Sequence, residues 1–292
     1  MPRRNGDSLR IAVQSNGRLT AYSLELLRDI GLEFEDHERR LFAKCRNLDV
    51  ELLFLRDDDI PEYVADGVAD LGIVGLNVIR EKGAELEQLV PLGFGFCALT
   101  LAVPANSGIE SPEDLSGTRI ATTHPRSLQT FLVDSGIDAE IVELSGGAEI
   151  APALDVSDAI CDLVSTGTTL RIHDLRRIGD LWESEAWLVA NSGVSENPTR
   201  SALAGRLRVR LDGLLTARRL KYVTLNAPAE ALPRIREILP GMRSPTVVPL
   251  AEGGMVAVHA AAQEEVFWEA MERLKEAGAT EILVLPVEKV MR

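Results

Sequence analysis

Along the first 90 residues, short apolar runs alternate with longer segments in which apolar residues recur every three or four positions. The runs at 9–13, 50–55 and 71–74 have the length and composition of buried strands. The segment 19–30 has helical spacing and ends at a glycine, and helical segments also follow the other two runs. This alternation predicts a parallel sheet with helices on its faces and a ligand site at the carboxyl ends of the strands.

A second series of the same kind follows a long apolar stretch at 89–103, which predicts a crossing from one lobe to another. It begins with a capped turn at Ser111. The predicted strands lie at 118–121, 139–144 and 159–164, and the predicted helices at 125–134 and 148–154. Two α/β lobes joined by extended crossings resemble the bilobal, type II periplasmic-binding-protein-like architecture, in which a ligand sits in the cleft between the lobes.

From residue 221 the order of the elements changes. A helix expected over 199–219 leads into strands at 222–225, 246–250, 255–260 and 281–285 and helices at 230–239 and 264–277. This βαββαβ order is that of a ferredoxin-like unit. A sensor domain and a dimerisation or stability module both explain it. The predicted domains are a first lobe over 1–98 and 183–219, a second lobe over 99–182, and a C-terminal domain over 220–292.

Charge narrows the classes of partner. The chain has 31 Lys and Arg residues against 45 Asp and Glu residues, a net charge of −14. Such a field repels phosphate backbones, so nucleic acid is not expected as a partner, whereas a pocket with backbone N–H groups and a few Arg side chains can still bind a small anion. The sequence shows neither an apolar run of bilayer length nor the apolar core of a signal peptide, which predicts a cytoplasmic protein without a membrane partner.

The cysteines and histidines do not indicate a metal site or a disulfide framework. Their spacing matches neither CxxC nor HExxH. The residues concerned are Cys45, Cys97, Cys161, His37, His124, His173 and His259. Each histidine is therefore interpreted as a surface or packing residue.

The most informative segment runs from Asp158 to Leu170. Apolar residues carry it through a buried strand, and a loop rich in hydroxyl groups then opens a helix. The loop residues are Ser165, Thr166, Gly167, Thr168 and Thr169, and with free helix N–H groups they form a cradle for a phosphate. Asp158 and Asp162 could accept hydrogen bonds from sugar hydroxyls or help to place a magnesium ion bound to phosphates. An ordinary Ser/Thr helix cap explains the loop equally well.

Two arginines follow predicted strands. Arg18 comes after Gly17 at the end of the first strand, where a phosphate or adenine contact is expected. The alternative for Arg18 is a surface arginine paired with a carboxylate. Arg56 precedes a run of acidic residues, and pairing with Asp57 or Asp58 explains it as well as a substrate contact does.

Two glycines follow in the segment DLGIVG. Gly72 and Gly75 lie in or just after the predicted strand at 71–74. A glycine there permits a ligand to approach the backbone, and tight packing of a helix is the equal alternative.

The segment from Glu149 to Leu170, which ends in DAICDLVSTGTTL, closely resembles the signature of the ATP phosphoribosyltransferase family, the first enzymes of histidine biosynthesis. The resemblance extends over nearly the whole chain. It includes SNGRL (15–19), RDDDIP (56–61), DLGIVG (70–75), RIATTHP (119–125), SPTVVPL (244–250) and ILVLPVEK (282–289). The tail resembles the long form of the family, whose third domain binds histidine as a feedback inhibitor.

This resemblance implies the reaction and the roles of the residues. ATP condenses with phosphoribosyl pyrophosphate in a magnesium-dependent step that gives N1-(5-phosphoribosyl)-ATP and pyrophosphate. Glu149, Asp158 and Asp162 are expected beside the sugar, and residues 165–169 around its 5-phosphate. Magnesium is expected mainly on substrate phosphates, with Asp158 or Asp162 as further ligands. The resemblance also implies a homo-oligomer, a dimer or a hexamer, and a histidine site that includes Asn226, Ser244, Pro245 and Thr246.

The chain departs from the family pattern at two places. Ser15 and Asn16 stand where members often carry a lysine, and Asp155 stands where the signature often has glycine. Two other classes share parts of the pattern. A secreted ligand-binding protein should have a signal peptide, and a regulated dehydratase of aromatic amino-acid synthesis has no use for the phosphate cradle. Release of pyrophosphate from ATP and phosphoribosyl pyrophosphate distinguishes these classes.

Overall fold

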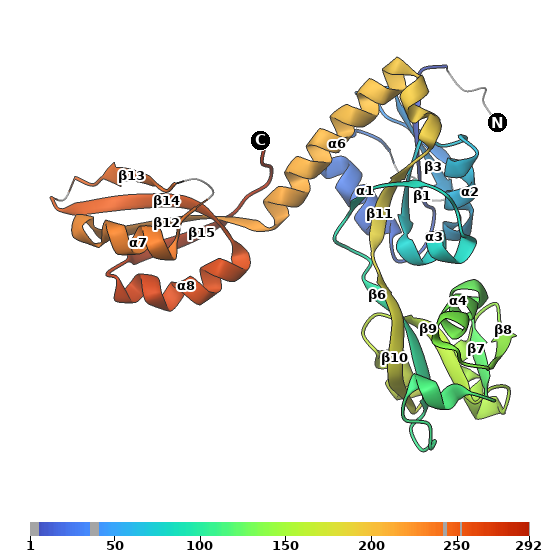
Figure 1. Cartoon of the computed structure of the whole chain (residues 1–292). Coiled ribbons are helices and arrows are strands. Elements are labelled where there is room, and N and C mark those ends of the chain that lie inside the picture. The colour runs from blue at the N-terminus through green and yellow to red at the C-terminus, as the bar shows by residue number, and fades with distance from the viewer. Residues whose placement is uncertain (1–5, 36–40, 242–243, 252, 292) are drawn as a thin grey trace. The chain divides into compact units, whose positions relative to one another are not determined.

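The computed structural model describes residues 6–35, 41–241, 244–251 and 253–291, without the side chains of residues 265–267. His37, interpreted above as a surface or packing residue, lies outside these ranges. The chain divides into two compact units, Met1–Ala204 and Gly205–Arg292. The first unit contains two of the sheets in Figure 1, which form lobes I and II, and the second unit contains the third sheet.

The sheet of lobe I has the strand order β2-β3-β1-β4-β11-β5. These strands are β2 (Phe42–Lys44), β3 (Val50–Leu55), β1 (Leu9–Gln14), β4 (Leu71–Gly75), β11 (Ala186–Ala190) and β5 (Glu87–Pro91). The central strands β3, β1 and β4 are parallel, whereas β11 runs antiparallel to both of its neighbours. β4 is buried along its whole length, as its continuous apolar sequence predicts. The helices are α1 (Thr20–Asp29), α2 (Ile60–Ala65) and α3 (Leu76–Lys82), and η1 (Asp57–Asp59) is a short 3₁₀ turn before α2.

The sheet of lobe II has the order β10-β6-β9-β7-β8. These strands are β10 (Leu175–Ser184), β6 (Cys97–Pro104), β9 (Ala159–Val164), β7 (Arg119–Thr122) and β8 (Glu140–Glu143). β7 is parallel to β8 and β9, and β6 is antiparallel to β9 and β10. The helices are α4 (Pro125–Ser135) and α5 (Thr168–Ile172), and the 3₁₀ turns include η2 (Pro112–Leu115), η3 (Ala148–Ile150) and η4 (Pro152–Leu154).

The structure corrects two details of the expected lobes. Parallel sheets were expected, but β10 and β11, which were not predicted, pair antiparallel because they carry the chain back from lobe II to lobe I. The helix expected over 148–154 is instead a pair of 3₁₀ turns that end at Asp155, whose φ is +56°. The predicted domain limits at 98/99 and 182/183 lie within the strands β6 and β10, and the division into domains stays a prediction.

The second unit has the sheet order β13-β14-β12-β15, with every pair antiparallel. Its strands are β12 (Leu220–Pro228), β13 (Thr246–Pro249), β14 (Met255–Gln263) and β15 (Thr280–Pro286), and its helices are α7 (Leu232–Ile238) and α8 (Glu264–Glu276). This confirms the ferredoxin-like βαββαβ unit. The long helix α6 (Pro198–Arg218) contains the limit between the two units. Among the described residues, no helix is both long and apolar enough to cross a bilayer.

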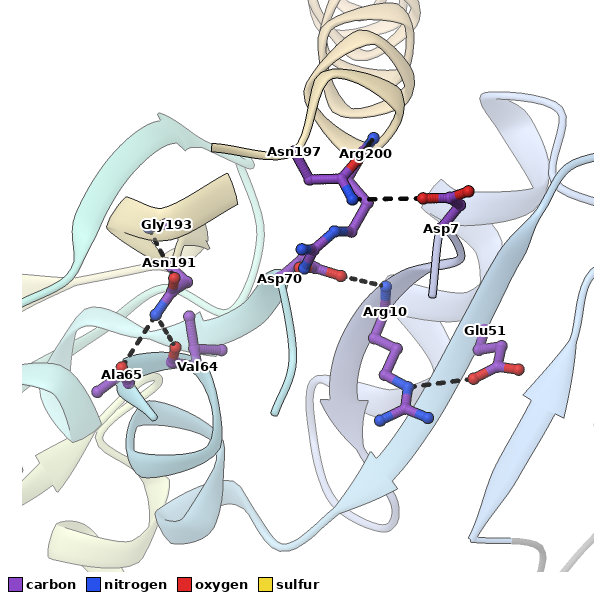
Figure 2. A network of polar contacts seen from close by, with 10 residues as sticks. All are labelled: Asp7, Arg10, Glu51, Val64, Ala65, Asp70, Asn191, Gly193, Asn197 and Arg200. Carbon is purple, nitrogen blue, oxygen red and sulfur yellow. Dashed lines mark hydrogen bonds and ion pairs between the residues drawn. The ribbon is translucent and has the colours of Figure 1, made fainter. Parts of the chain in front are cut away.

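A buried carboxylate ties the start of α6 to the sheet of lobe I (Figure 2). Asp70, which is 2% exposed, lies just before β4. One of its oxygens accepts a hydrogen bond from the backbone N–H of Arg10 at 2.8 Å, and the other accepts from the Arg200 guanidinium at 2.7 Å. The side chain of Asn191, just after β11, donates to the carbonyl of Val64 at 2.7 Å. The amino ends of β1 and β4 and the first turn of α6 are thus held together by one anion.

We expect Asp70→Asn to destabilise the first unit. The amide leaves the partly buried Arg200 without a counter-charge and presents an N–H group to a donor, so the free energy of unfolding should fall by about 3 kcal/mol. Urea unfolding measures this loss. Asp66→Asn, at an exposed position close by, is the control and should change the stability by less than about 0.5 kcal/mol. Equal stability of the two variants would contradict a structural role for the Asp70 pair.

Candidate active site

A cavity of about 220 Å³ lies at the carboxyl end of β9 and brings together residues from both lobes. Lobe I contributes Arg18. The lining residues that lobe II contributes are Glu149, Ile160, Asp162, Leu163, Val164, Ser165, Thr166, Gly167, Thr169 and Leu170. The cavity therefore gathers most of the residues that the sequence predicts for the phosphate cradle and the sugar. Thr168 is exposed and does not line it.

The loop between β9 and α5 has the backbone of an anion-binding turn. Gly167 precedes α5 with a φ of +71°, a left-handed conformation that favours glycine, and open space lies where a Cβ would stand. No side chain caps the first turn of α5. The Thr166 and Thr168 hydroxyls lie 3.1 Å apart, and the Arg171 guanidinium donates to the Thr168 hydroxyl at 3.4 Å. The N–H groups of the turn are therefore left for a ligand, and the alternative of a Ser/Thr helix cap is not what the structure shows.

Two carboxylates stand beside this loop. Asp162 lies within β9, and one of its oxygens accepts hydrogen bonds from the Leu163 N–H at 2.8 Å and from the Thr123 hydroxyl at 3.4 Å. Burial raises the pKa of Asp162, and the negative charge of Glu149 adds to the increase. Since a cation would relieve this repulsion, the pair is suited to a sugar that becomes positively charged.

The structure corrects the predicted grouping of Asp158 with Asp162. Asp158 lies before the amino end of β9, and it accepts hydrogen bonds from the Arg119 backbone N–H at 2.8 Å and from the Arg119 guanidinium at 3.4 Å. These hydrogen bonds lower its pKa. Because β9 separates Asp158 from the cradle by six residues, the distance is about 20 Å. Asp158 therefore holds β7 and β9 together and does not reach the cavity.

Gly72 and Gly17, two of the predicted glycines of lobe I, have different roles. A Cβ on Gly72 would lie 2.8 Å from Val64 and 3.1 Å from Ile60, so this buried glycine lets α2 pack against β4, and the packing alternative is correct. Gly17 has a φ of +142° in the turn after β1. Across that turn, the backbone N–H of Leu19 donates a hydrogen bond to the side-chain oxygen of Gln14 at 2.9 Å. Gly17 thus shapes the turn from which Arg18 reaches the cavity.

Arg56 is exposed at the carboxyl end of β3. Within the described part of the chain, its guanidinium forms no ion pair with Asp57 or Asp58. The alternative of a local ion pair is therefore not seen, and the substrate role of Arg56 stays a prediction.

Reasoning from the sequence missed Asp57, a partly buried carboxylate on the turn after β3 whose pKa responds to the charge of Arg18. Its Oδ1 atom is buried and has no hydrogen-bond partner among the described residues. Burial raises the pKa of Asp57 to about 6, the neighbouring Asp58 adds to the increase, and the Arg18 guanidinium opposes it. The only signal was the acidic run after Arg56, and a sequence cannot show which of three adjacent carboxylates is buried.

His124, interpreted above as a surface or packing residue, directly precedes α4 in lobe II. Its Nδ1 atom lies 2.8 Å from the Thr123 hydroxyl, and burial lowers its pKa against the opposing charges of Glu81, Asp162 and Asp58. Glu81, on α3 of lobe I, accepts hydrogen bonds at 2.9 and 3.0 Å from the first N–H groups of α4 in lobe II. A carboxylate from one lobe thus caps a helix of the other.

The residues predicted for a histidine site lie in the second unit. Ser244 is exposed, Pro245 is buried, and Thr246 begins β13. Asn226 lies on β12 and donates its side-chain amide to Glu281 on β15. Because β14 separates β12 from β13, Asn226 is about 10 Å or more from Thr246. The structure brings three of the four residues together and places Asn226 apart.

Comparison with known proteins agrees with this geometry. Residues 56–212 match the family ATP phosphoribosyltransferase, and residues 217–289 match the family described as HisG, C-terminal domain. The ATP phosphoribosyltransferase of Cytophaga hutchinsonii is 43% identical over 284 residues, 97% of this chain and 99% of the relative. That of Parabacteroides distasonis is 44% identical over 283 residues, again 97% of this chain and 99% of the relative.

A solved structure resembles the first two lobes. It is a chain of the ATP phosphoribosyl transferase (HisG:HisZ) complex from Thermotoga maritima, with a TM-score of 0.60 and 28% identity. The match covers 70% of this chain and 98% of that chain. This match confirms the bilobal fold, and the match of residues 217–289 to the C-terminal family domain confirms the additional domain.

We expect Asp57→Asn to stabilise the substrate-free protein above about pH 4. The pKa of Asp57 is higher in the folded protein than in the unfolded chain, so the folded state loses stability as pH rises from about 4 through 6 and the carboxylate ionises. The amide cannot ionise. The variant should therefore become more stable than wild type over this pH range. Above it, the difference in the free energy of unfolding should stay at about 1 to 2 kcal/mol, a value that allows for the partial exposure of the side chain.

Thermal unfolding between pH 4 and 8 measures this difference. Asp58→Asn removes the same charge from an exposed neighbour and is the matched control. If both variants gained stability equally, general charge repulsion would account for the effect and not the burial of Asp57.

Proposed function

Since this chain belongs to the ATP phosphoribosyltransferase family of pentosyltransferases, we propose that it condenses ATP with phosphoribosyl pyrophosphate. The products are N1-(5-phosphoribosyl)-ATP and pyrophosphate, in the committed step of histidine biosynthesis. One observation supports this most strongly: a turn with free N–H groups, two carboxylates and an arginine from the other lobe share one cavity.

In this proposal, phosphoribosyl pyrophosphate binds to lobe II. The N–H groups that follow Gly167 and the nearby hydroxyls hold the 5-phosphate. This placement directs the ribose towards Glu149 and Asp162, which line the same cavity. Their negative charges stabilise the ribose as its anomeric carbon becomes cation-like.

ATP enters from the side of lobe I. The lone pair of adenine N1 forms the bond to the anomeric carbon, and the electron pair of the breaking carbon–oxygen bond leaves with pyrophosphate. No general base is required, because adenine N1 carries no proton at neutral pH. Catalysis then consists of aligning the two substrates and compensating charge.

Arginines supply the positive field that the chain as a whole lacks. With a net charge of −14, the protein repels polyanions unless cations are gathered locally. Arg18 reaches into the cavity, and Arg56 stands exposed at the end of the neighbouring strand β3. Both guanidinium groups are suited to phosphate oxygens.

The residues at the cavity are compatible with magnesium that binds through the substrates. Among the residues that the structure describes, no three His, Cys, Asp or Glu side chains form a group that could hold a metal ion. Magnesium often binds through one or two carboxylates and substrate phosphates, and Asp162 and Glu149 offer two carboxylates here. When bound, the ion would neutralise the leaving pyrophosphate.

Regulation by histidine is assigned in this proposal to the C-terminal domain, around Ser244, Pro245 and Thr246. Its ferredoxin-like fold and its match to the C-terminal family domain support the assignment. A homo-oligomer, a dimer or a hexamer, is also proposed for this chain.

We expect Gly167→Val to abolish binding of phosphoribosyl pyrophosphate while leaving the protein folded. The branched side chain stands where the phosphate must approach the backbone, and the left-handed φ adds strain of about 1–2 kcal/mol. The melting temperature with and without phosphoribosyl pyrophosphate and magnesium measures binding. Release of pyrophosphate from both substrates tests the reaction itself.

Gly136→Val is the matched control for this experiment. Gly136 has a φ of +67° and equally open space, but it ends α4 away from the cavity. Both variants should lose similar stability, and only the Gly167 variant should lose the substrate-induced shift. A shift retained by that variant would contradict the cradle.

We expect histidine to bind to the full chain and to bind less tightly when substrate is present, because coupling between two sites is reciprocal. The double variant Ser244→Ala/Thr246→Ala loses both hydroxyls, and its affinity for histidine, measured by calorimetry, should be about 3- to 10-fold lower. Thr130→Ala, in lobe II, should have no effect. Absence of binding to the full chain would contradict the regulatory assignment.

A further inference from the structure

We propose that Asp57 binds the exocyclic 6-amino group of the adenine ring and thereby selects an adenine nucleotide as the acceptor. This inference rests on the proposed reaction. The substrate contacts suggested above do not include Asp57. Here its carboxylate stabilises the positive charge that develops on the base as the new bond forms.

Asp57 lies beside the loop that carries Arg18. β1 and β3 are parallel neighbours that pair from Leu9↔Val50 to Gln14↔Leu55, and the Ser15 N–H donates to the Leu55 carbonyl at 2.7 Å. The loops after the two strands therefore lie side by side. One carries Arg18, which lines the cavity, and the other carries Asp57, whose pKa responds to the charge of Arg18.

The adjoining residue shows the direction in which this turn faces. The turn η1 contacts α3, whose Glu81 caps α4 of lobe II, and the charge of Asp58 acts on His124 at the start of that helix. The turn η1, which contains Asp57 and Asp58, is thus on the cleft side of lobe I. A ligand held on lobe II by the 165–169 loop presents its reacting end to this side.

The hydrogen-bonding capacity of the Asp57 carboxylate is unsatisfied. Oδ1 is buried without a donor. The Asp57 side chain forms no hydrogen bond with the described residues, and the residue is only partly buried as a whole, so its remaining exposure includes Oδ2. A carboxylate that water cannot solvate on one side is a strong acceptor on the other, and a buried acceptor without a donor needs an explanation.

The chemistry of the substrates decides which donor it accepts from. A carboxylate repels the phosphates of both substrates, so its partner is an N–H or O–H donor. The ribose of phosphoribosyl pyrophosphate is already directed to Glu149 and Asp162 on lobe II. The atom of ATP that reacts is N1, and its adjacent exocyclic substituent is the 6-amino group. That amine must therefore lie close to the junction between the two substrates.

The reaction makes this contact stronger as it proceeds. When the N1 lone pair bonds to the anomeric carbon and the leaving oxygen takes the electron pair of the broken bond, the N1–C6–N6 unit gains positive charge. A carboxylate on the amine opposes that charge. Because the contact is stronger in the transition state than in the ground state, it raises kcat and not only affinity.

Binding of two nucleotides to the full chain tests the assignment. Calorimetry compares ATP with purine riboside triphosphate, which has hydrogen in place of the 6-amino group. Wild type should bind ATP about 10-fold or more tightly than the analogue. Asp57→Ala should reduce that ratio to less than about 3, and Asp57→Asn, which keeps an acceptor oxygen but no charge, should give an intermediate ratio and a kcat at least 10-fold below wild type.

Two controls separate this result from a general change in charge or folding. Asp58→Ala removes the same charge from the exposed neighbour and should keep the wild-type ratio. Phosphoribosyl pyrophosphate should raise the melting temperature of all variants equally. The Asn variant tests the idea independently if the Ala variant does not fold.

The outcomes distinguish this inference from the proposed function. If wild type releases pyrophosphate from the two substrates but binds both nucleotides equally, or if Asp57→Ala keeps the wild-type ratio, the role of Asp57 is wrong and the reaction stands. If wild type neither binds ATP nor releases pyrophosphate, the proposed function itself is wrong.

Discussion

The pairing of the two segments that cross between the lobes determines the geometry of the site. The Leu92 N–H donates to the Ala186 carbonyl, and the Ala186 N–H donates to the Phe94 carbonyl, each at 2.9 Å. These bonds join the segment that leaves lobe I to the segment that returns. Gly95, in the first crossing, has its Cα so close to Leu19 that a Cβ would lie 2.4 Å from that side chain. The crossing therefore packs against the turn that carries Arg18, and the arginine is positioned relative to lobe II.

The charges follow the direction of the strands. At the amino ends of the strands, Asp70 and Asp158 accept hydrogen bonds from backbone N–H groups and arginines, and they hold the fold together. At or near the carboxyl ends, Asp57 and Asp162 are partly buried, and this burial raises the pKa of both. Aspartates are thus paired with donors at the amino ends of the strands, whereas at the carboxyl ends their hydrogen-bonding capacity is less fully used. Stability comes from the first edge, and the second retains capacity for a ligand.

The sequence predicted most of the strands and the cradle because these depend on local patterns. Apolar runs and their bounding glycines are local, and the strand at 159–164 has the predicted limits. β10 was missed because its sequence, LRRIGDLWES, is not a continuous apolar run, and β11 was missed because it follows β10 with no helix between them. Asp158 was grouped with Asp162 because both flank one segment, but a strand carries its two ends to opposite edges of a sheet. The burial of Asp57 depends on contacts between distant segments, which no local pattern contains.

In the proposed reaction, the sharing of the site between two lobes lets a strongly acidic chain bind two polyanions. Each lobe alone offers an incomplete set of groups: lobe II has the N–H turn and two carboxylates, and lobe I has arginines beside a partly buried carboxylate. Phosphates are attracted by the first set and by the arginines. Asp57 repels them and accepts only a donor, so the base of the nucleotide and not its phosphates belongs next to it. In this proposal, the opposite charges of Arg18 and Asp57 in lobe I fix which end of the nucleotide points to which residue, whereas affinity for phosphate alone would not distinguish the two ends.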